Sequence, residues 1–140
     1  FRPDDTIIRS EVTKMAICAL GLEDAAEASK GTSKFPDVSH SHWANGYINL
    51  ATDMGIIIGD DKGKFRPNDT ITYAEAMTIM VRALGFEPKA QEKGGFPSGY
   101  ILTASENGLT DKVQGSSSKT ISRGNVAYLT MNALEAQMME

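Results

Sequence analysis

The stretch FRPNDTITYAEAMTIMVRALG, residues 65–85, occurs a second time in altered form as FRPDDTIIRSEVTKMAICALG, residues 1–21. The copies lie 64 positions apart, and ten of their 21 positions are identical: Phe1, Arg2, Pro3, Asp5, Thr6, Ile7, Glu11, Ala19, Leu20 and Gly21. Such self-similarity indicates that the chain is built from copies of one structural unit. Arg9 of the first copy is replaced by Tyr73 in the second.

The second half of this stretch has the pattern of a capped α-helix. Its apolar side chains follow one helix face: Ala76, Ile79, Met80, Ala83 and Leu84. Thr72 and Glu75 form the T-x-x-E capping box, in which two side chains satisfy free N–H groups of the first turn. Gly85 suits the left-handed residue that ends a helix. Ile8 stands in the place of Thr72 in the first copy, so we expect a weaker cap there.

A third copy begins at Ile121, 50 residues after Ile71, and keeps the apolar register: Val126, Leu129, Thr130, Ala133 and Leu134. Asn125 replaces the capping glutamate. No glycine stops this helix, so we expect it to continue towards Met138. The chain opens inside the repeated unit, and we therefore expect it to be part of a longer protein.

Two further helices are predicted between the copies. HWANGYINLATDMG, residues 42–55, places apolar side chains on one helix face, and GYILTASENG, residues 99–108, repeats it in shorter form. GIIIG, residues 55–59, is a candidate for short strands. We predict loops near Glu23–Lys34, Gly59–Lys64, Glu87–Gly95 and Lys112–Lys119.

Composition narrows the function classes. The net charge is −4, so no overall positive field favours nucleic acid or anionic lipid. No apolar stretch approaches the roughly 20 residues of a membrane span. The single cysteine, Cys18, is expected to be a small buried hydrophobe. The only histidines, His40 and His42, do not make a metal site by themselves, and we expect no metal, no cofactor and no catalytic set.

The order of these elements resembles the surface-layer homology (SLH) repeat, whose pattern runs F-x-D-V, H-W-A, Y-I, A, G-I-I-x-G, D-G-x-F-x-P and I-T-R-A-E before a helix. The matching residues are Phe35, Asp37, Val38, His42, Trp43, Ala44, Tyr47, Ile48, Ala51, Gly55, Ile56, Ile57, Gly59, Gly63, Phe65, Pro67, Ile71, Thr72, Ala74 and Glu75. The middle copy matches in full layout, the first is truncated and the third is eroded.

The resemblance implies a mainly α fold: one module of residues 1–140, with three SLH-type repeats in a pseudo-threefold arrangement around a central three-helix bundle. The repeats would be residues 1–30 (partial), 31–90 and 91–140 (degenerate). It also implies an extracellular protein at the cell wall or S-layer surface. The partner would be a polysaccharide attached to peptidoglycan, with no nucleic acid, no membrane insertion and no enzymatic activity. Self-association or contact with S-layer partners stays open.

The usual ligand of the family is a secondary cell-wall polysaccharide, often capped with a pyruvate ketal and held in grooves between repeats. The tryptophan of H-W-A and the arginine of T-R-A-E take part, here Trp43, Arg9 and Arg123. A guanidinium recognises a carboxylate through two parallel charge-assisted hydrogen bonds. The alternative for each arginine is a solvated or paired surface group, and for Trp43 it is core packing. A concave site that contains Trp43 together with Arg9 or Arg123 would favour the ligand-binding role over these alternatives.

Five further residues complete the predicted glycan site. Glu11 and Glu75 are candidates whose simpler role is capping, and Lys62 and Lys64 are candidates within a sequence that we expect to form a turn. Tyr73 supplies no positive charge, so its site is either inactive or binds a neutral sugar by stacking. The competing hypothesis is a degenerate SLH module that acts as a structural or protein-interaction unit. Tyr73, Asn125 and the missing H-W-A of the third repeat favour it.

Overall fold

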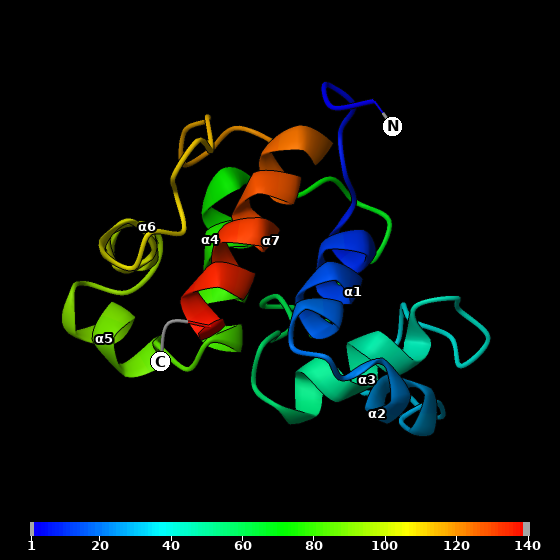
Figure 1. The fold of residues 1–140 in the computed structure, drawn as a ribbon. Helices are drawn as coiled ribbons and strands as arrows, with labels where there is room; N and C mark the ends of the chain where they lie inside the picture. Colours follow the sequence, from blue (N-terminus) through cyan, green and yellow to red (C-terminus); the bar gives the residue numbers. More distant parts are fainter. Residues whose placement is uncertain (1, 139–140) are drawn as a thin grey trace.

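The computed structural model describes residues 2–138, which form seven α-helices and no strand (Figure 1). The helices are α1 (Arg9–Ala19), α2 (Glu23–Ala28), α3 (Asn45–Asp53), α4 (Tyr73–Ala83), α5 (Glu87–Glu92), α6 (Ser98–Glu106) and α7 (Arg123–Met138). The expectation of a mainly α fold is confirmed, and α7 continues to Met138 as its lack of a stop signal predicts. None of the helices in this range is long and apolar enough to cross a membrane.

Three parts of the sequence-based prediction are wrong. Helices α2 and α5 lie within segments expected to be loops. Residues 55–59 form no strand, and Ile56 and Ile57 are instead buried in the core. Trp43 precedes α3 and does not continue its apolar face. Six-residue helices such as α2 and α5 have fewer than two turns, too few to show a periodic pattern. Helices this short form only when they pack against a neighbour.

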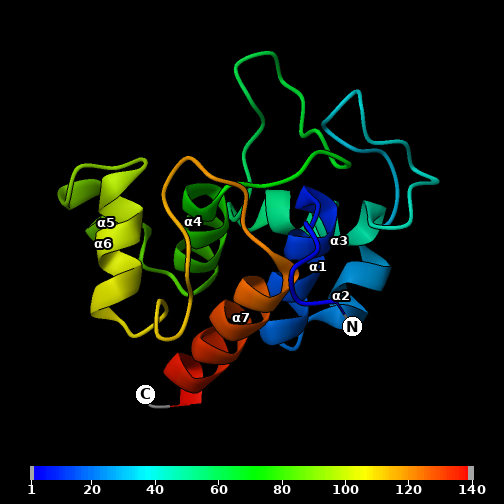
Figure 2. The same cartoon turned by 90° about the horizontal axis from the view of Figure 1, so that it is seen from above.

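The three helices with repeated sequence, α1, α4 and α7, meet at the centre of the molecule. Each of them contacts the other two (Figures 1 and 2). Their buried side chains include Val12, Met77, Met80 and Leu129, each at most 1% exposed. The pair α2–α3 packs beside α1, and the pair α5–α6 packs beside α4. Both pairs therefore lie outside the central helices.

The start of each central helix is bonded to the turn before another one. The N–H of Arg9 donates to the carbonyl of Asp69, that of Tyr73 to Lys119, and that of Arg123 to Asp5, at 2.9 Å in all three cases. The next residue along repeats the pattern: Ser10 to Pro67, Ala74 to Ser117 and Gly124 to Pro3. Isolated bridges join the same segments: Ile8 with Thr70, Thr72 with Thr120, and Ser122 with Thr6. The repeated turn thus positions the N-terminus of a neighbouring helix.

The two outer helix pairs have the same construction. A Cβ atom built on Gly46 of α3 would lie 2.1 Å from the carbonyl oxygen of Ala26, and one on Gly99 of α6 would lie 2.3 Å from that of Ala90. The corresponding residues are separated by 53 and 64 positions. Each pair therefore needs glycine where the two backbones approach.

Candidate functional site

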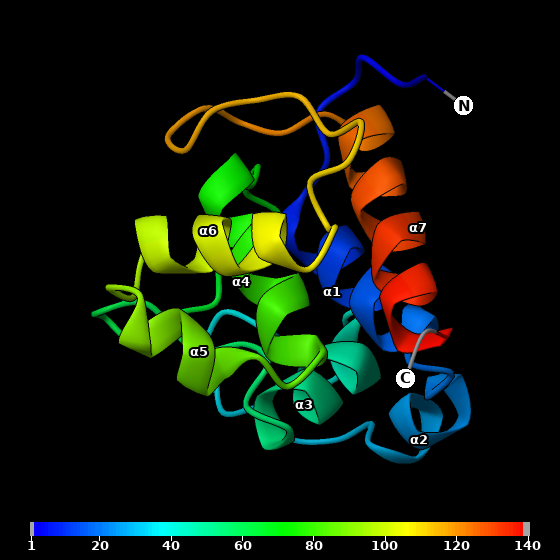
Figure 3. The ribbon, with the colours of Figure 1, turned by 60° about the vertical axis from the view of Figure 1, so that its left-hand side comes forward.

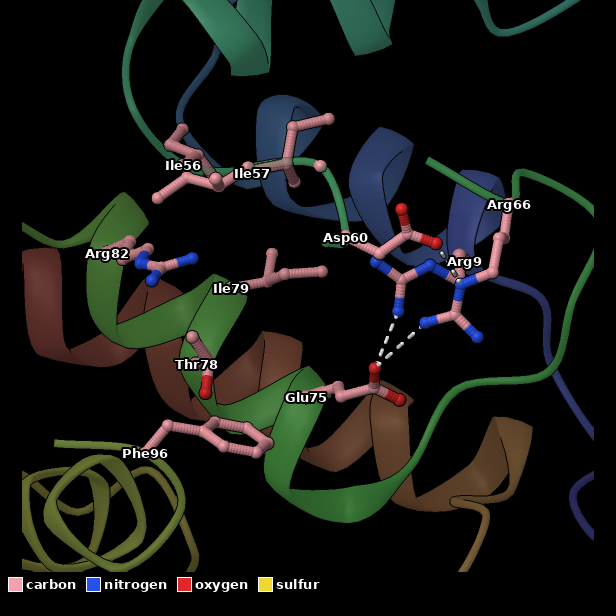
Figure 4. Close-up of a pocket in the computed structure, with 12 residues that line it drawn as sticks. Arg9, Ile56, Ile57, Asp60, Arg66, Glu75, Thr78, Ile79, Arg82 and Phe96 are labelled. Carbon is pink, nitrogen blue, oxygen red and sulfur yellow. Dashed lines mark hydrogen bonds and ion pairs between the residues drawn. The ribbon is translucent and has the colours of Figure 1, made fainter. Parts of the chain in front are cut away.

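A cavity of about 410 Å³, which we call the first groove, lies where α1, α4 and residues 56–60 meet. Its walls carry the side chains of Arg9, Arg66, Asp60 and Glu75 at one end and of Phe96 at the other (Figure 4). Phe96 lies two residues before the start of α6 and is mostly exposed. The groove thus combines charged groups with an accessible aromatic face.

Arg9 is the buried charge of the first groove. Its Nη1 donates to Glu75 Oε2 at 2.9 Å, its Nε donates to the carbonyl of Phe65 at 2.8 Å, and its guanidinium lies over the Phe65 ring. Burial lowers the pKa of the Arg9 guanidinium and the Glu75 carboxylate opposes this shift. Arginine nevertheless keeps its charge in proteins. Arg9 therefore lines the first groove and also binds the turn that contains Phe65.

Arg66 is a groove residue that the sequence analysis missed. Its Nη2 lies 3.6 Å from Glu75 Oε2, and its Nε lies 3.5 Å from Asp60 Oδ2. Arg66 has a positive φ of 61°, a conformation uncommon outside glycine. Asp37 holds this backbone, because its two oxygens accept the N–H groups of Phe65 and Arg66 at 3.1 and 2.7 Å. Asp37, the aspartate of F-x-D-V, was the one feature of the sequence pattern that could have indicated this turn.

A second cavity of about 410 Å³, the second groove, lies between α1 and the start of α7. It brings together Trp43, Arg123, Glu11 and Lys14. Arg123 Nη2 donates to both oxygens of Glu11 at 2.8 Å. Lys14 Nζ lies 5.9 Å from the Trp43 ring centroid, within cation–π range. The combination of Trp43 with Arg123 in one concave site is thus present.

Trp43 forms a wall of the second groove. Its side chain is 51% exposed and its ring stacks on His42. The core-packing alternative for Trp43 is therefore wrong. About half of the surface of Trp43 is therefore accessible from the solvent.

The two grooves are built from corresponding positions. Arg9 and Arg123 occupy the same place in their copies, as do Glu75 and Glu11. Phe96 lies 53 residues after Trp43, the same offset that separates Tyr100 from Tyr47. Each groove thus pairs the arginine of one copy with the glutamate of another and borders an aromatic side chain.

The third junction lacks this pair. The corresponding positions are Tyr73 and Asn125, so the arginine and the glutamate are both absent from the same place. Tyr73 is only 8% exposed and is covered by Gly115, where an added Cβ would lie 2.7 Å from its ring. Burial raises the pKa of the Tyr73 hydroxyl. The stacking of a sugar on Tyr73 is not supported, because its ring belongs to the core.

The remaining candidates lie apart from both grooves or play a structural part. Lys62 and Lys64 are exposed on the turn, and neither side chain lines the first or the second groove. Glu75 and Thr72 form the complete capping box of α4, and Glu11 forms half of one by accepting the N–H of Ile8 at 3.1 Å. Both glutamates thus cap a helix and hold an arginine at once.

Cys18 lines the second groove, whereas the sequence predicted a buried residue. Burial raises the pKa of its thiol, and the nearby Glu23 adds to the shift. His42 Nδ1 accepts the N–H of Ala44 at 3.0 Å, so this ring is held by the start of α3. Within residues 2–138 no three His, Cys, Asp or Glu side chains cluster as metal ligands would.

Asp60, which lines the first groove, should make the stability of the fold depend on pH. Its Oδ1 accepts the N–H groups of Lys64 and Lys62, both at 2.9 Å, and these bonds lower its pKa from 3.8. Folding thus favours the ionised carboxylate. Its contribution to stability is fully present above pH 3.8, the ordinary pKa, and is lost as the pH falls through the lower pKa of the folded state.

Asp60→Asn should therefore flatten the acid-side loss of stability, measured as the urea midpoint between about pH 5 and about pH 2. The exposed neighbour Asp61 provides the matched control, Asp61→Asn. Identical pH profiles for the two variants would show that Asp60 contributes no specific interaction.

One known protein family matches the middle of the chain. Residues 34–77 match the model of the S-layer homology domain. Over this segment the chain is similar to the S-layer homology (SLH) domain. The matched segment contains Trp43 of the second groove and Glu75 of the first. It also contains Asp37 and Arg66, which shape the turn.

Relatives extend the match over the whole chain. The middle cell wall protein of Brevibacillus brevis is 34% identical over 137 residues, which is 98% of this chain. The cell surface protein of Thermoanaerobacter kivui is 36% identical over the full chain, and the surface layer protein of Brevibacillus choshinensis is 31% identical. The chain spans only 13%, 18% and 12% of these relatives. The names of these relatives refer to the cell wall, the cell surface and the surface layer, in agreement with the class expected from the sequence.

Proposed function

We propose that this SLH module anchors a larger surface protein to the cell wall without a covalent bond. It does so by binding an anionic secondary cell-wall polysaccharide, such as one that carries a pyruvate ketal. The observation that carries the proposal is the second groove, where Trp43 and Arg123 line one open cavity. The names of the relatives, which refer to the cell wall and the surface layer, support the same location.

The free donors of Arg123 suit a carboxylate. Glu11 is held by Nη2 alone, and among the described residues Nε and Nη1 have no hydrogen-bond partner. The Arg123 side chain is 35% exposed, compared with 10% for Arg9. Glu11 thus fixes the guanidinium while its outer edge faces the groove, so little conformational entropy is lost on binding. Lys14 adds a second positive charge.

In the first groove the exposed cation is Arg66 rather than Arg9. Its side chain is 41% exposed, and its three carboxylate neighbours lie at 3.5 to 3.6 Å, longer than strong hydrogen bonds. A ligand carboxylate can therefore take a position on Arg66 without breaking a short ion pair. The Phe96 face supplies the aromatic wall but no N–H donor.

The module has three SLH repeats in a pseudo-threefold arrangement, with α1, α4 and α7 as the central bundle. Residues 1–30, 31–90 and 91–140 form the repeats, the first partial and the last degenerate. The argument for the symmetry is the cyclic set of backbone bonds from each helix start to a neighbouring turn. The first and second grooves then lie at two of the three junctions and bind anionic glycan.

The third junction fits the competing hypothesis instead. With Tyr73 buried and Asn125 in place of glutamate, it presents no arginine to an anion. We assign to this junction a structural or protein-contact role, and to the module as a whole no enzymatic activity. The active grooves then number two.

Binding to purified wall sacculi tests the proposal. The chain should sediment with sacculi that retain their secondary polysaccharide and stay in solution when that polysaccharide has been extracted. Arg9→Ala together with Arg123→Ala should weaken binding to intact sacculi. Equal binding to extracted and intact sacculi would overturn the glycan assignment, and unchanged binding in the double variant would overturn the residue assignment.

A further inference from the structure

His42 stacks on Trp43, the aromatic wall of the second groove. The two ring centroids lie 5.7 Å apart and the ring planes are inclined by 29°. Trp43 is 51% exposed and is not among the apolar side chains that pack on the core, so core contacts leave its indole ring free to turn. Within residues 2–138 the ring interacts with the imidazole of His42 and with the long, exposed side chain of Lys14. His42 is therefore the more rigid of its two neighbours.

The imidazole of His42 is itself held by the backbone. Its Nδ1 accepts the N–H of Ala44 at 3.0 Å. Ala44 is fully buried, and its carbonyl accepts the N–H of Ile48 at 2.9 Å in the first turn of α3. Helix α3 packs on α1, which lines the second groove (Figure 3). A ring that is fixed to the start of α3 is thus fixed relative to the groove.

The first groove lacks such a ring. Phe96 corresponds to Trp43, and the residue before it is Gly95 in the place of His42. Gly95 has a φ of 69°, in the left-handed region that favours glycine. Phe96 lies instead against Tyr100 of α6, with the ring centroids 6.4 Å apart. The stacked imidazole therefore distinguishes the second groove from the first.

From these contacts we propose that His42 is a positioning residue of the second groove. It holds the indole of Trp43 in the orientation that a ligand meets, and the bond to Ala44 holds the imidazole in turn. A ring that is already fixed loses less conformational entropy when a sugar packs on it, so affinity is gained without any contact between His42 and the ligand. The gain in affinity rests on the proposed function, whereas the orientation of Trp43 does not.

Two variants separate the bond to Ala44 from the stacked ring. In His42→Asn the Oδ1 atom can accept the N–H of Ala44 in place of Nδ1, but the ring is lost, and His42→Ala loses both. Trp43 is the only tryptophan, so the tryptophan fluorescence of the protein reports on this side chain alone. Both variants should lower the anisotropy of this fluorescence and weaken binding of a ketal-bearing oligosaccharide by about threefold to tenfold. His42→Asn should keep the urea midpoint of the unchanged chain.

The matched control is His40→Asn, at the other histidine, which is exposed and lines neither groove. It should change neither the anisotropy nor the affinity. If His42→Asn keeps both values as well, His42 only supports the start of α3 and the proposal is overturned. An anisotropy that falls while the affinity stays constant would support the positioning of Trp43 by His42 and would overturn the proposed role of Trp43 in glycan binding. The two proposals can therefore fail separately, and His42→Asn decides the matter even if His42→Ala does not fold.

Discussion

Arg123→Ala should weaken binding to pyruvylated wall polysaccharide by about tenfold to a hundredfold, and Trp43→Ala by about tenfold. In the proposed function the outer N–H groups of Arg123 bind the ligand carboxylate, and Trp43, which is 51% exposed, packs against the sugar. Arg123→Lys separates charge from geometry. It keeps the positive charge but loses the planar fork, so it should recover only part of the affinity. Affinity is measured by calorimetry with the purified polysaccharide.

The unfolding midpoint must stay close to that of the unchanged chain for this comparison to hold. Trp43 is exposed, so its loss should cost little stability. Exposed Arg2 and exposed Met54 provide controls of matched type, Arg2→Ala and Met54→Ala, outside the second groove. If the groove variants bind as tightly as these controls, the second groove is not the binding site.

Gly46→Ala should destabilise the module by about 3 kcal/mol or more. The added methyl group would lie 2.1 Å from the carbonyl oxygen of Ala26. Because this oxygen belongs to the backbone, it cannot relieve the clash by a rotamer change as a side chain could. Elsewhere in a helix the same change is stabilising by roughly 0.5–1 kcal/mol. Gly99→Ala should behave similarly, because its Cβ would lie 2.3 Å from the oxygen of Ala90.

Urea unfolding measures both effects. Ser105→Ala, at an exposed position of α6, tests helix propensity alone and should change stability by less than about 0.5 kcal/mol. An unchanged or raised midpoint for Gly46→Ala would mean that α2 and α3 do not approach as closely as described.

Much of the fold can be predicted from local sequence. The periodic apolar residues of residues 73–84 and the T-x-x-E box specify a capped helix, and Thr72 and Glu75 form both bonds of that box. The repeat offset then predicts α1 and α7. Helices α2 and α5 were missed because each has six residues, too few for periodicity, and depends on a partner helix.

The types of residue that line the two grooves could be predicted from the sequence, but their pairing could not. Arg9, Arg123 and Trp43 follow from the repeat pattern, whereas the assignment of Arg123 to Glu11, 112 positions away, follows only from how the helices meet. Arg66 lies in a turn with no pattern of its own and enters the first groove through a left-handed backbone held by Asp37. That Tyr73 and Asn125 replace the arginine and the glutamate of one and the same junction likewise becomes visible only once the copies are packed together.

The central claim is that two grooves recognise the anionic group of a wall polysaccharide. Calorimetric titration with oligosaccharides of that polysaccharide, with and without the pyruvate ketal, tests it most directly. We predict two binding sites per chain for the ketal form, one of them lost in Arg123→Ala, and at least about a tenfold weaker affinity without the ketal. Equal affinity for both forms, or a site that persists unchanged in Arg123→Ala and in Arg9→Ala with Arg66→Ala, would contradict it.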